Sequence, residues 1–236
     1  MARAAVSGRL AWRVARLAGT NEETGTARTL VFDVPDWPGH LAGQHVDVRL
    51  TAEDGYTAQR SYSLSAPGRV ELTVQRIPDG EVSPYLTDVI RVGDPVEIRG
   101  PVGGWFVWRP DSGRDVLLVA GGSGIAPLMA MIRARRLAGS GARFWLVYST
   151  RTPDDVYYAD ELRRSDPGLD VTHVYTRLAP EGWPRPPGRL APADFEDGPA
   201  DCDCFICGPT GFVESAADLL LARGHDPRRI KTERFG

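Results

Sequence analysis

Cysteine and lysine are both scarce in this chain of 236 residues, and each shortage narrows the possible functions. The three cysteines, Cys202, Cys204 and Cys207, lie in one short segment and are too few for a disulfide scaffold. They are also too few for a plant-type iron–sulfur cluster, which requires four thiolates. We therefore expect a reduced, cytoplasmic protein, with any iron–sulfur centre on another chain. Lys231 is the only lysine among 28 basic residues, so arginine supplies nearly all cationic contacts.

Long hydrophobic runs and a strong net charge are absent as well. No apolar run reaches the roughly 18 residues of a membrane span, and the first ten residues lack the apolar core of a secretory signal. A net charge of -3 argues against nucleic acid as a partner. The sequence contains no nucleophile elbow, no zincin helix and no P-loop motif, which excludes the simplest hydrolase and kinase interpretations.

The cysteine segment does not predict a metal site. Its spacing, C-x-C-x2-C, lacks a fourth ligand, and neither His173 nor His225 has the spacing of a zinc ligand. The four histidines are dispersed along the chain, so we expect them at the surface or in loops. Cys202 and Cys204 are interpreted as small buried apolar residues or as simple surface cysteines.

Residues 1–109 have the pattern of an all-β domain. Short segments rich in valine and leucine alternate with turn residues such as Asp54-Gly55 and Val92-Gly93-Asp94. A single helix is expected near residues 83–89. The pattern predicts an N-terminal six-stranded antiparallel β-barrel, with strands near 9–17, 29–34, 45–50, 60–64, 70–75 and 95–99.

Residues 110–236 have a different pattern, which starts after the turn-rich segment 109–113. The continuous apolar run at 116–120 is typical of a strand that is buried on both faces. Strands and helices then alternate, which predicts a C-terminal α/β domain with a doubly wound parallel sheet. The further strands are expected near 144–149, 171–175, 204–207 and 230–232, and the helices near 127–137, 159–164 and 212–223.

Two motifs in the first half could bind an anion or a ring. Arg60-Ser61-Tyr62-Ser63 ends a strand, where the arginine can pair with a phosphate and the tyrosine can lie against a ring. Gly80-Glu81-Val82-Ser83 opens the brief helix and offers free backbone N–H groups. Each motif has an ordinary alternative: an exposed strand with a half-buried tyrosine, and a serine helix cap.

The second half carries a glycine-rich loop and a short motif, each at the carboxyl end of a strand. Gly121-Gly122-Ser123-Gly124-Ile125-Ala126-Pro127 joins a buried strand to a helix, which is where dinucleotide folds hold a pyrophosphate. Cys207-Gly208-Pro209 follows another strand. The chain ends in Glu233-Arg234-Phe235-Gly236, which the residues alone would describe as a frayed tail.

Taken together and in this order, the motifs resemble the ferredoxin–NADP reductase superfamily over nearly the whole chain. The resemblance implies that Arg60 binds a flavin pyrophosphate, that Tyr62 stacks on the isoalloxazine and that Ser63 hydrogen-bonds near flavin N5. Gly80 and Ser83 match the second flavin-phosphate element. FAD is the implied flavin, with FMN as the alternative.

The same resemblance assigns the nicotinamide site. Cys207, Gly208 and Pro209 match the element beside the nicotinamide, and Glu233 and Phe235 resemble the carboxy-terminal acid and aromatic, although Gly236 follows them here. The implied catalytic residues are Ser63, Cys207 and Glu233. The nucleotide loop is matched by Gly121, Gly122, Gly124 and Pro127.

The resemblance also bears on the choice of nucleotide. Thr176-Arg177 follows the third strand, as the family's 2′-phosphate sites do, and Arg151 follows the second. No acidic residue for a ribose 2′-hydroxyl is evident at the end of the second strand. We therefore predict NADP, with NAD as the alternative.

The implied activity is that of a flavoprotein oxidoreductase of the ferredoxin–NADP reductase type. It would take a hydride from NAD(P)H to FAD and pass single electrons to a separate acceptor protein such as a ferredoxin. One alternative is a reductase that serves an oxygenase, a haem protein or a molybdenum enzyme directly. The other is a non-catalytic subunit that senses flavin or nucleotide on the same fold.

Overall fold

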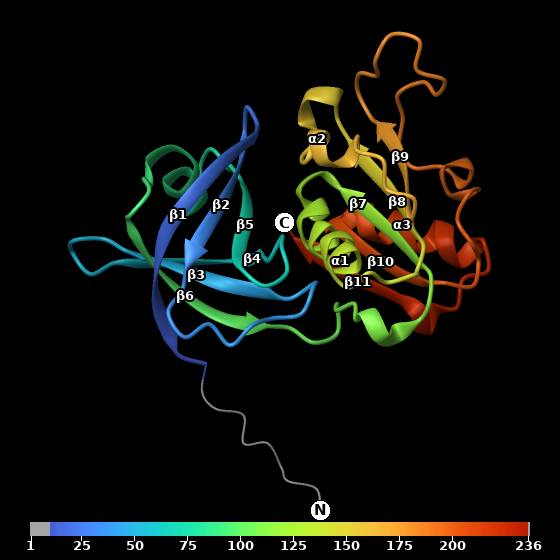
Figure 1. Ribbon diagram of the computed structural model, residues 1–236. Helices are drawn as coiled ribbons and strands as arrows, with labels where there is room; N and C mark the ends of the chain where they lie inside the picture. Colours follow the sequence, from blue (N-terminus) through green and yellow to red (C-terminus); the bar gives the residue numbers. More distant parts are fainter. Residues whose placement is uncertain (1–9, 236) are drawn as a thin grey trace, which may run out of the picture.

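The computed structural model describes residues 10–235, which form two β-sheets of different kinds (Figure 1). The first sheet has six antiparallel strands in the order β4-β3-β6-β1-β2-β5. A bridge between Leu64, just after β4, and Leu72 of β5 joins the two edges and closes the sheet into the predicted barrel. The strands are β1 (Trp12–Thr24), β2 (Ala27–Asp33), β3 (His45–Thr51), β4 (Thr57–Ser63), β5 (Val70–Gln75) and β6 (Pro95–Val102).

Alternation of side chains along the barrel strands builds its core. In β3, Val46 and Val48 are fully buried inside the barrel, whereas the residues between them face outward. A short helix, η1 (Tyr85–Val89), closes one end of the barrel and inserts Leu86 into this core. The helix begins at Ser83, as expected, because Ser83 and Pro84 are already helical and lead into η1. The Ser83 hydroxyl accepts a hydrogen bond of 3.0 Å from the Ile77 N–H of the preceding loop.

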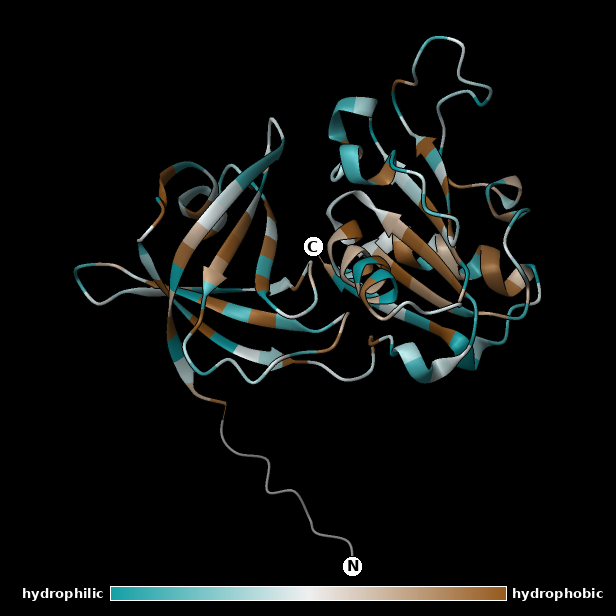
Figure 2. Ribbon diagram, in the orientation of Figure 1, coloured by the Kyte–Doolittle hydropathy of each residue, from teal (hydrophilic) through white to brown (hydrophobic). Residues whose placement is uncertain are grey.

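The second sheet has five parallel strands in the order β11-β10-β7-β8-β9, as a doubly wound fold requires. Helix α1 (Ile125–Leu137) packs on one face and α3 (Thr210–Ala222) on the other, while α2 (Ala159–Leu162) is a single turn. Hydrophobic residues are concentrated in these central strands (Figure 2). The strands are β7 (Val116–Gly121), β8 (Phe144–Thr150), β9 (Leu169–Tyr175), β10 (Asp203–Pro209) and β11 (Ile230–Phe235).

The last strand is longer than the sequence pattern indicated. Residues Ile230 to Phe235 pair one by one with β10, from Cys204 to Pro209. The end of the described chain is therefore part of the sheet, not a frayed tail, because parallel pairing gives its backbone groups partners. Figure 1 shows this carboxyl end between the barrel and the parallel sheet.

His225 lies in a loop, as expected, but it is not at the surface. Its side chain is only 3% exposed, and its Nδ1 lies 3.4 Å from the Cys204 sulfur. Cys202 and Cys204 are buried too, which leaves the buried interpretation of these thiols and excludes the surface one. The sequence could not indicate this contact, because it depends on how the α3–β11 connection folds back over the start of β10.

The barrel and the parallel sheet meet through polar side chains. Arg133 of α1 donates hydrogen bonds to the Ser65 carbonyl (3.0 Å) and to the carboxylate of Glu71 (2.5 Å), which is buried. The hydroxyls of Thr73 and Tyr158 lie 2.5 Å apart across the same boundary. These contacts fix the two sheets relative to each other. Within residues 10–235, no helix is long and apolar enough to cross a membrane.

Candidate functional site

The candidate site is built where β4 of the barrel meets the carboxyl ends of β10 and β11. Ser63, the last residue of β4, donates a hydrogen bond of 3.1 Å from its Oγ to Oε1 of Glu233 in β11. Cys207 of β10 is the register partner of Glu233. The structure therefore brings together all three residues that the sequence analysis named as catalytic candidates.

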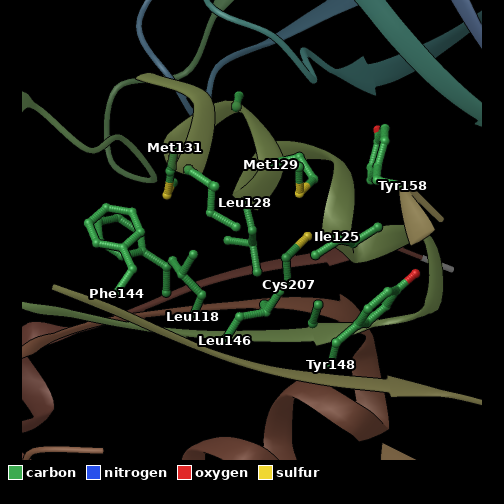
Figure 3. Packing of buried hydrophobic residues seen from close by; sticks show 14 of the residues in the cluster. Leu118, Ile125, Leu128, Met129, Met131, Phe144, Leu146, Tyr148, Tyr158 and Cys207 are labelled. Atoms are coloured by element: carbon green, nitrogen blue, oxygen red, sulfur yellow. The ribbon is translucent and has the colours of Figure 1, made fainter. Parts of the chain in front are cut away.

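Burial controls the electrostatics of this trio. The pKa of Glu233 is raised by desolvation, against which the hydrogen bond from Ser63 acts. Burial, and then the charge of Glu233, raise the pKa of the Cys207 thiol well above its usual range. Figure 3 shows this thiol pointing from the sheet toward α1, near Ile125 and Leu128. Cys207 is therefore a protonated thiol and not an activated nucleophile.

Glu233 also has a free acceptor atom. Its Oε2 is buried, and within the described residues it has no hydrogen-bond partner. Burying an acceptor without a hydrogen-bond donor costs free energy. The unpaired Oε2 therefore indicates that a polar group of a ligand binds beside Glu233. The carboxyl is suited to hold a proton or to accept a hydrogen bond at this point.

The glycine-rich loop approaches β10 so closely that side chains are excluded. A Cβ at Gly124 would lie 2.2 Å from the Cys207 carbonyl oxygen, and a Cβ at Gly121 or Gly208 would lie 2.7 Å from the Phe212 ring. Gly122 has φ +54 and faces open space, as a turn at a phosphate site requires. Helix α1 starts at Ile125, two residues earlier than expected, which places Pro127 still within its first turn.

A cavity of about 210 Å³ lies between the glycine-rich loop and the barrel. Its wall comes from both sheets, and half of the predicted nucleotide residues contribute to it. Those outside the wall are Gly124, Pro127, Arg177, Cys207 and Gly208. This shared wall is the strongest single indication of a ligand site at the junction. The lining residues are Thr26, Gln75, Gly121, Gly122, Ser123, Ser149, Thr150, Arg151, Asp155, Tyr157, Thr176, Pro209, Phe212 and Phe235.

The carboxyl ends of β8 and β9 place Arg151, Thr176 and Arg177 side by side. The Thr176 N–H donates to the Thr150 carbonyl, and the Arg177 N–H donates to the Arg151 carbonyl, each at 2.9 Å. Arg151 and Thr176 line the cavity, whereas Arg177 is exposed beside it. Asp155 also lines the cavity and was missed by the sequence analysis, which looked for an acid directly after the strand.

The carboxylate of Asp155 already accepts hydrogen bonds within the turn that follows β8. Its Oδ2 accepts from the Thr152 N–H at 3.0 Å and from the Thr152 hydroxyl at 2.8 Å. This capping box fixes the turn after β8. The carboxylate therefore has less free acceptor capacity than an acid waiting for a ribose hydroxyl would have.

The two predicted flavin-phosphate elements lie together on the barrel. Arg60 of β4 contacts the carboxylate of Glu81 at 3.4 Å, and Glu81 lies between Gly80 and Ser83. Packing at Gly80 is tight, since a Cβ there would lie 3.0 Å from the Ser83 hydroxyl and 3.1 Å from the Ile77 carbonyl oxygen. Glu81 was not singled out by the sequence, because no pattern marks an acid as the partner of a distant arginine.

A second, larger hollow of about 620 Å³ adjoins this pair, with Tyr56, Glu81 and Tyr85 in its wall. Tyr62 lies between Arg60 and Ser63 on the same strand and is half-buried against the barrel core. Desolvation raises the pKa of its phenol to about 12, so the ring is neutral. The strand thus presents a cation, an aromatic ring and a hydroxyl in sequence, a donor set that fits a flavin.

Two family models match the chain, one for each half. Residues 15–107 match the oxidoreductase FAD-binding domain, and residues 118–218 match the oxidoreductase NAD-binding domain. The first match covers the strand with Arg60, Tyr62 and Ser63. The second covers the glycine-rich loop and Cys207.

Named proteins with similar sequences are reductase components. The chain is 33% identical over 235 residues to the ferredoxin reductase component of 3-ketosteroid-9-alpha-monooxygenase from Mycolicibacterium smegmatis, covering 93% of this chain and 64% of the relative. It is 29% identical over 206 residues to the reductase component of propane 2-monooxygenase from Rhodococcus jostii, covering 82% of this chain and 55% of the relative. The chain thus spans less than two thirds of these curated relatives.

A solved structure has the same fold over almost the full length of both chains. It is the FAD/NAD-binding domain of nitric oxide dioxygenase from Vibrio cholerae, with a TM-score of 0.85 and 26% identity, covering 95% of this chain and 98% of the other. With its FAD-binding and NAD-binding domains in this order and this fold, the chain belongs to the ferredoxin–NADP reductase superfamily.

Proposed function

We propose that the chain takes a hydride from NAD(P)H to FAD and passes single electrons to a separate acceptor protein. The observation that carries this proposal is the contact of Ser63 with Glu233, beside Cys207. It places hydrogen-bonding groups of both sheets around one point, where a ring held by the barrel would meet a ring held by the parallel sheet. When bound, a flavin accepts the hydride as an electron pair and can release the electrons singly.

The barrel residues would bind both the phosphates and the isoalloxazine of FAD. Arg60 would exchange its contact of 3.4 Å with Glu81 for a charge-assisted bond to a phosphate, and Gly80 and Ser83 would flank that phosphate. Tyr62 would cover the isoalloxazine, and Ser63 would orient its hydroxyl toward N5. The hollow of about 620 Å³ beside Glu81 favours FAD over FMN, because it offers room for an adenosine.

The parallel sheet would hold the nucleotide across the cavity of about 210 Å³. Gly121, Gly122, Gly124 and the first turn of α1 with Pro127 would face the pyrophosphate. Arg151, with Thr176 and Arg177 beside it, supports NADP over NAD, since these residues place positive charge where a 2′-phosphate would lie. Cys207, Gly208 and Pro209 would border the nicotinamide.

Three residues at the junction, Ser63, Phe235 and Cys207, would orient the Glu233 carboxyl, cover the ring and shape the site. Ser63 donates to Glu233 and so holds its carboxyl in one orientation. Phe235 follows Glu233 by two residues and lines the cavity, where it would shield the ring surface until a nicotinamide enters. The Cys207 thiol stays protonated because of its burial and contributes shape and a weak donor.

The proposed arrangement has a flavin domain at residues 1–109 and a nucleotide domain at residues 110–236. The named relatives are reductase components, which supports an electron acceptor on another protein or component. A ferredoxin is our first candidate acceptor. An oxygenase component is the second, because both relatives belong to monooxygenase systems.

Anaerobic reduction of the purified, FAD-loaded protein tests the proposal. Adding NADPH is expected to bleach the visible flavin absorbance, and adding a ferredoxin is then expected to restore it while cytochrome c is reduced downstream. Restoration by an oxygenase component alone would favour the second acceptor. A protein that stays yellow with NADPH and NADH, or that binds no flavin, would contradict the proposal and favour a sensing subunit.

A further inference from the structure

A cluster of two thiols and an imidazole lies at the opposite end of β10 from Cys207. The sulfur atoms of Cys202 and Cys204 are 3.8 Å apart, and the Cys204 sulfur is 3.4 Å from Nδ1 of His225. All three side chains are at least 97% buried, as their exposures are 1%, 0% and 3%. None of them contributes to the site described above.

The spacing of these atoms fits the edges of a metal coordination shell. With Zn–S near 2.3 Å and Zn–N near 2.0–2.1 Å, a tetrahedral ion separates two sulfurs by about 3.8 Å and a sulfur from a nitrogen by about 3.6 Å. The structure has 3.8 Å and 3.4 Å for these two edges. The third edge, from Cys202 to His225, is within 4.8 Å, so a modest rotation of the imidazole closes the triangle.

The apolar surroundings of the cluster favour a metal ion that, together with its three ligands, carries no net charge. The two cysteines belong to an apolar cluster with Leu117, Phe195 and Leu220. Two thiolates and a neutral imidazole carry a charge of −2, which a divalent cation cancels. A monovalent ion on the same ligands would leave a net charge in a low-dielectric region.

Two further atoms bear on the cluster, namely the Pro199 carbonyl oxygen and Nε2 of His225. The Cys202 thiol donates a hydrogen bond of 3.2 Å to the Pro199 carbonyl oxygen, which would be the candidate fourth ligand once the thiol proton has left. Nε2 of His225 is buried and has no hydrogen-bond partner among residues 10–235. Among the described residues, therefore, only one of the two ring nitrogens has a hydrogen-bond partner, and that partner is the Cys204 thiol.

We propose that Cys202, Cys204 and His225 form a structural Zn²⁺ site in the parallel sheet. Binding replaces the two thiol protons, which leave to solvent, by two Zn–S bonds. The ion would tie the segment before β10 to the connection between α3 and β11. Because β10 and β11 carry Cys207 and Glu233 at their other ends, the site would fix the register of the strands that build the redox site.

Metal content of the purified full chain tests the site directly. Protein treated with a reductant and Zn²⁺, then freed of loose ions, is expected to retain one zinc per chain by mass spectrometry. Cys204→Ser and His225→Gln are expected to reduce this content at least about tenfold, and Cys207→Ser, a matched change on the other face of the sheet, is expected to retain it. Zinc is expected to raise the melting temperature of the wild type by roughly 3–6 °C, but not that of His225→Gln.

One further measurement, made on the wild type alone, keeps the proposal falsifiable if a variant folds poorly. Co²⁺ bound to the wild type is expected to give the intense d–d absorption of a tetrahedral site with thiolate ligands. The inference is overturned if reduced wild type retains no zinc, if His225→Gln and Cys207→Ser retain equal amounts, or if the protein as purified contains a Cys202–Cys204 disulfide and takes up no metal after that disulfide is reduced.

Discussion

The hydroxyl of Ser63 and the carboxylate of Glu233 form a hydrogen bond of 3.1 Å across 170 residues of sequence. The bond joins the last residue of a barrel strand to an edge strand of the parallel sheet. Desolvation raises the pKa of the half-buried Glu233 carboxyl, while the hydrogen bond from Ser63 opposes this effect. Both stability and activity should therefore respond to the protonation of Glu233.

The pH dependence of stability is the first prediction. A carboxyl with a raised pKa stabilises the fold fully below its unfolded value of about 4.3, and this contribution is lost as the pH rises through the folded value. Thermal melting of the wild type should therefore fall relative to Glu233→Gln as the pH increases over that range. In Ser63→Ala the loss should move to higher pH, because the hydrogen bond that lowers the pKa is gone. A gap between wild type and Glu233→Gln that widens in favour of the wild type with rising pH would contradict this prediction.

Cys207 should be inert toward alkylation in the folded protein. Its thiol is buried, and its pKa is raised by burial and by Glu233, so the reactive thiolate is not populated near neutral pH. Peptide mapping after iodoacetamide treatment at pH 8 should show no label at Cys207, and the same treatment in denaturant should label it fully. Labelling of the folded protein with matching loss of flavin reduction would instead identify an accessible, activated thiol.

Close packing at Gly124 predicts an intolerance to any side chain. The Cβ of Gly124→Ala would lie 2.2 Å from the Cys207 carbonyl oxygen, so the loop or β10 must shift. We expect a loss of about 2–3 kcal/mol of unfolding free energy and a higher KM for the nucleotide. Gly211→Ala in α3 meets nothing within 4 Å and should change stability by less than about 1 kcal/mol. Equal effects of the two changes on urea unfolding would refute the packing argument.

The boundary between the sheets depends on Arg133. This arginine donates to the buried carboxylate of Glu71 at 2.5 Å and to Glu161 at 2.6 Å, with only 21% of its side chain exposed. Arg133→Ala leaves the buried Glu71 carboxylate without its α1 partner and should cost about 3 kcal/mol. Arg143→Ala breaks an exposed pair with Asp170 and should cost less than about 1 kcal/mol. Denaturant unfolding monitored by fluorescence gives the unfolding free energy of both variants. A similar loss of unfolding free energy in both would show that the buried ion pair contributes no more to stability than the exposed one.

The sequence predicted the two sheets well because each leaves a strong local pattern. Alternation in β3 and the unbroken apolar run of β7 identify a barrel strand and a buried parallel strand without any knowledge of their neighbours. The position of α1 was also predictable, apart from its first two residues, since strand, glycine-rich loop and helix follow directly in the chain.

Contacts between segments that are distant in the chain could not be predicted from the sequence. Glu81 beside Arg60, Asp155 at the cavity and His225 beside Cys204 depend on loop paths that no local pattern encodes. Glu233 could be named only through the family resemblance, because a residue near the chain end gives no sign that it will pair in a strand. His225 lies in a loop, as expected, but its burial beside Cys204 was not foreseen for the same reason, since dispersal along the chain says little about proximity in space.

Nucleotide preference should depend on Arg151 more than on Arg177. Arg151 lines the cavity with Thr176, whereas Arg177 is exposed beside it. A charge-assisted bond to a 2′-phosphate contributes about 1.5–3 kcal/mol, so Arg151→Ala should lower kcat/KM for NADPH roughly 10- to 100-fold and leave kcat/KM for NADH nearly unchanged. Arg177→Ala should give a smaller loss in the same direction, and Arg143→Ala, at the other end of β8, should give none. Steady-state reduction of an artificial acceptor measures all four proteins with both nucleotides. A wild type that uses NADH as well as NADPH, or an equal loss with both nucleotides in Arg151→Ala, would show that these arginines do not select the phosphate.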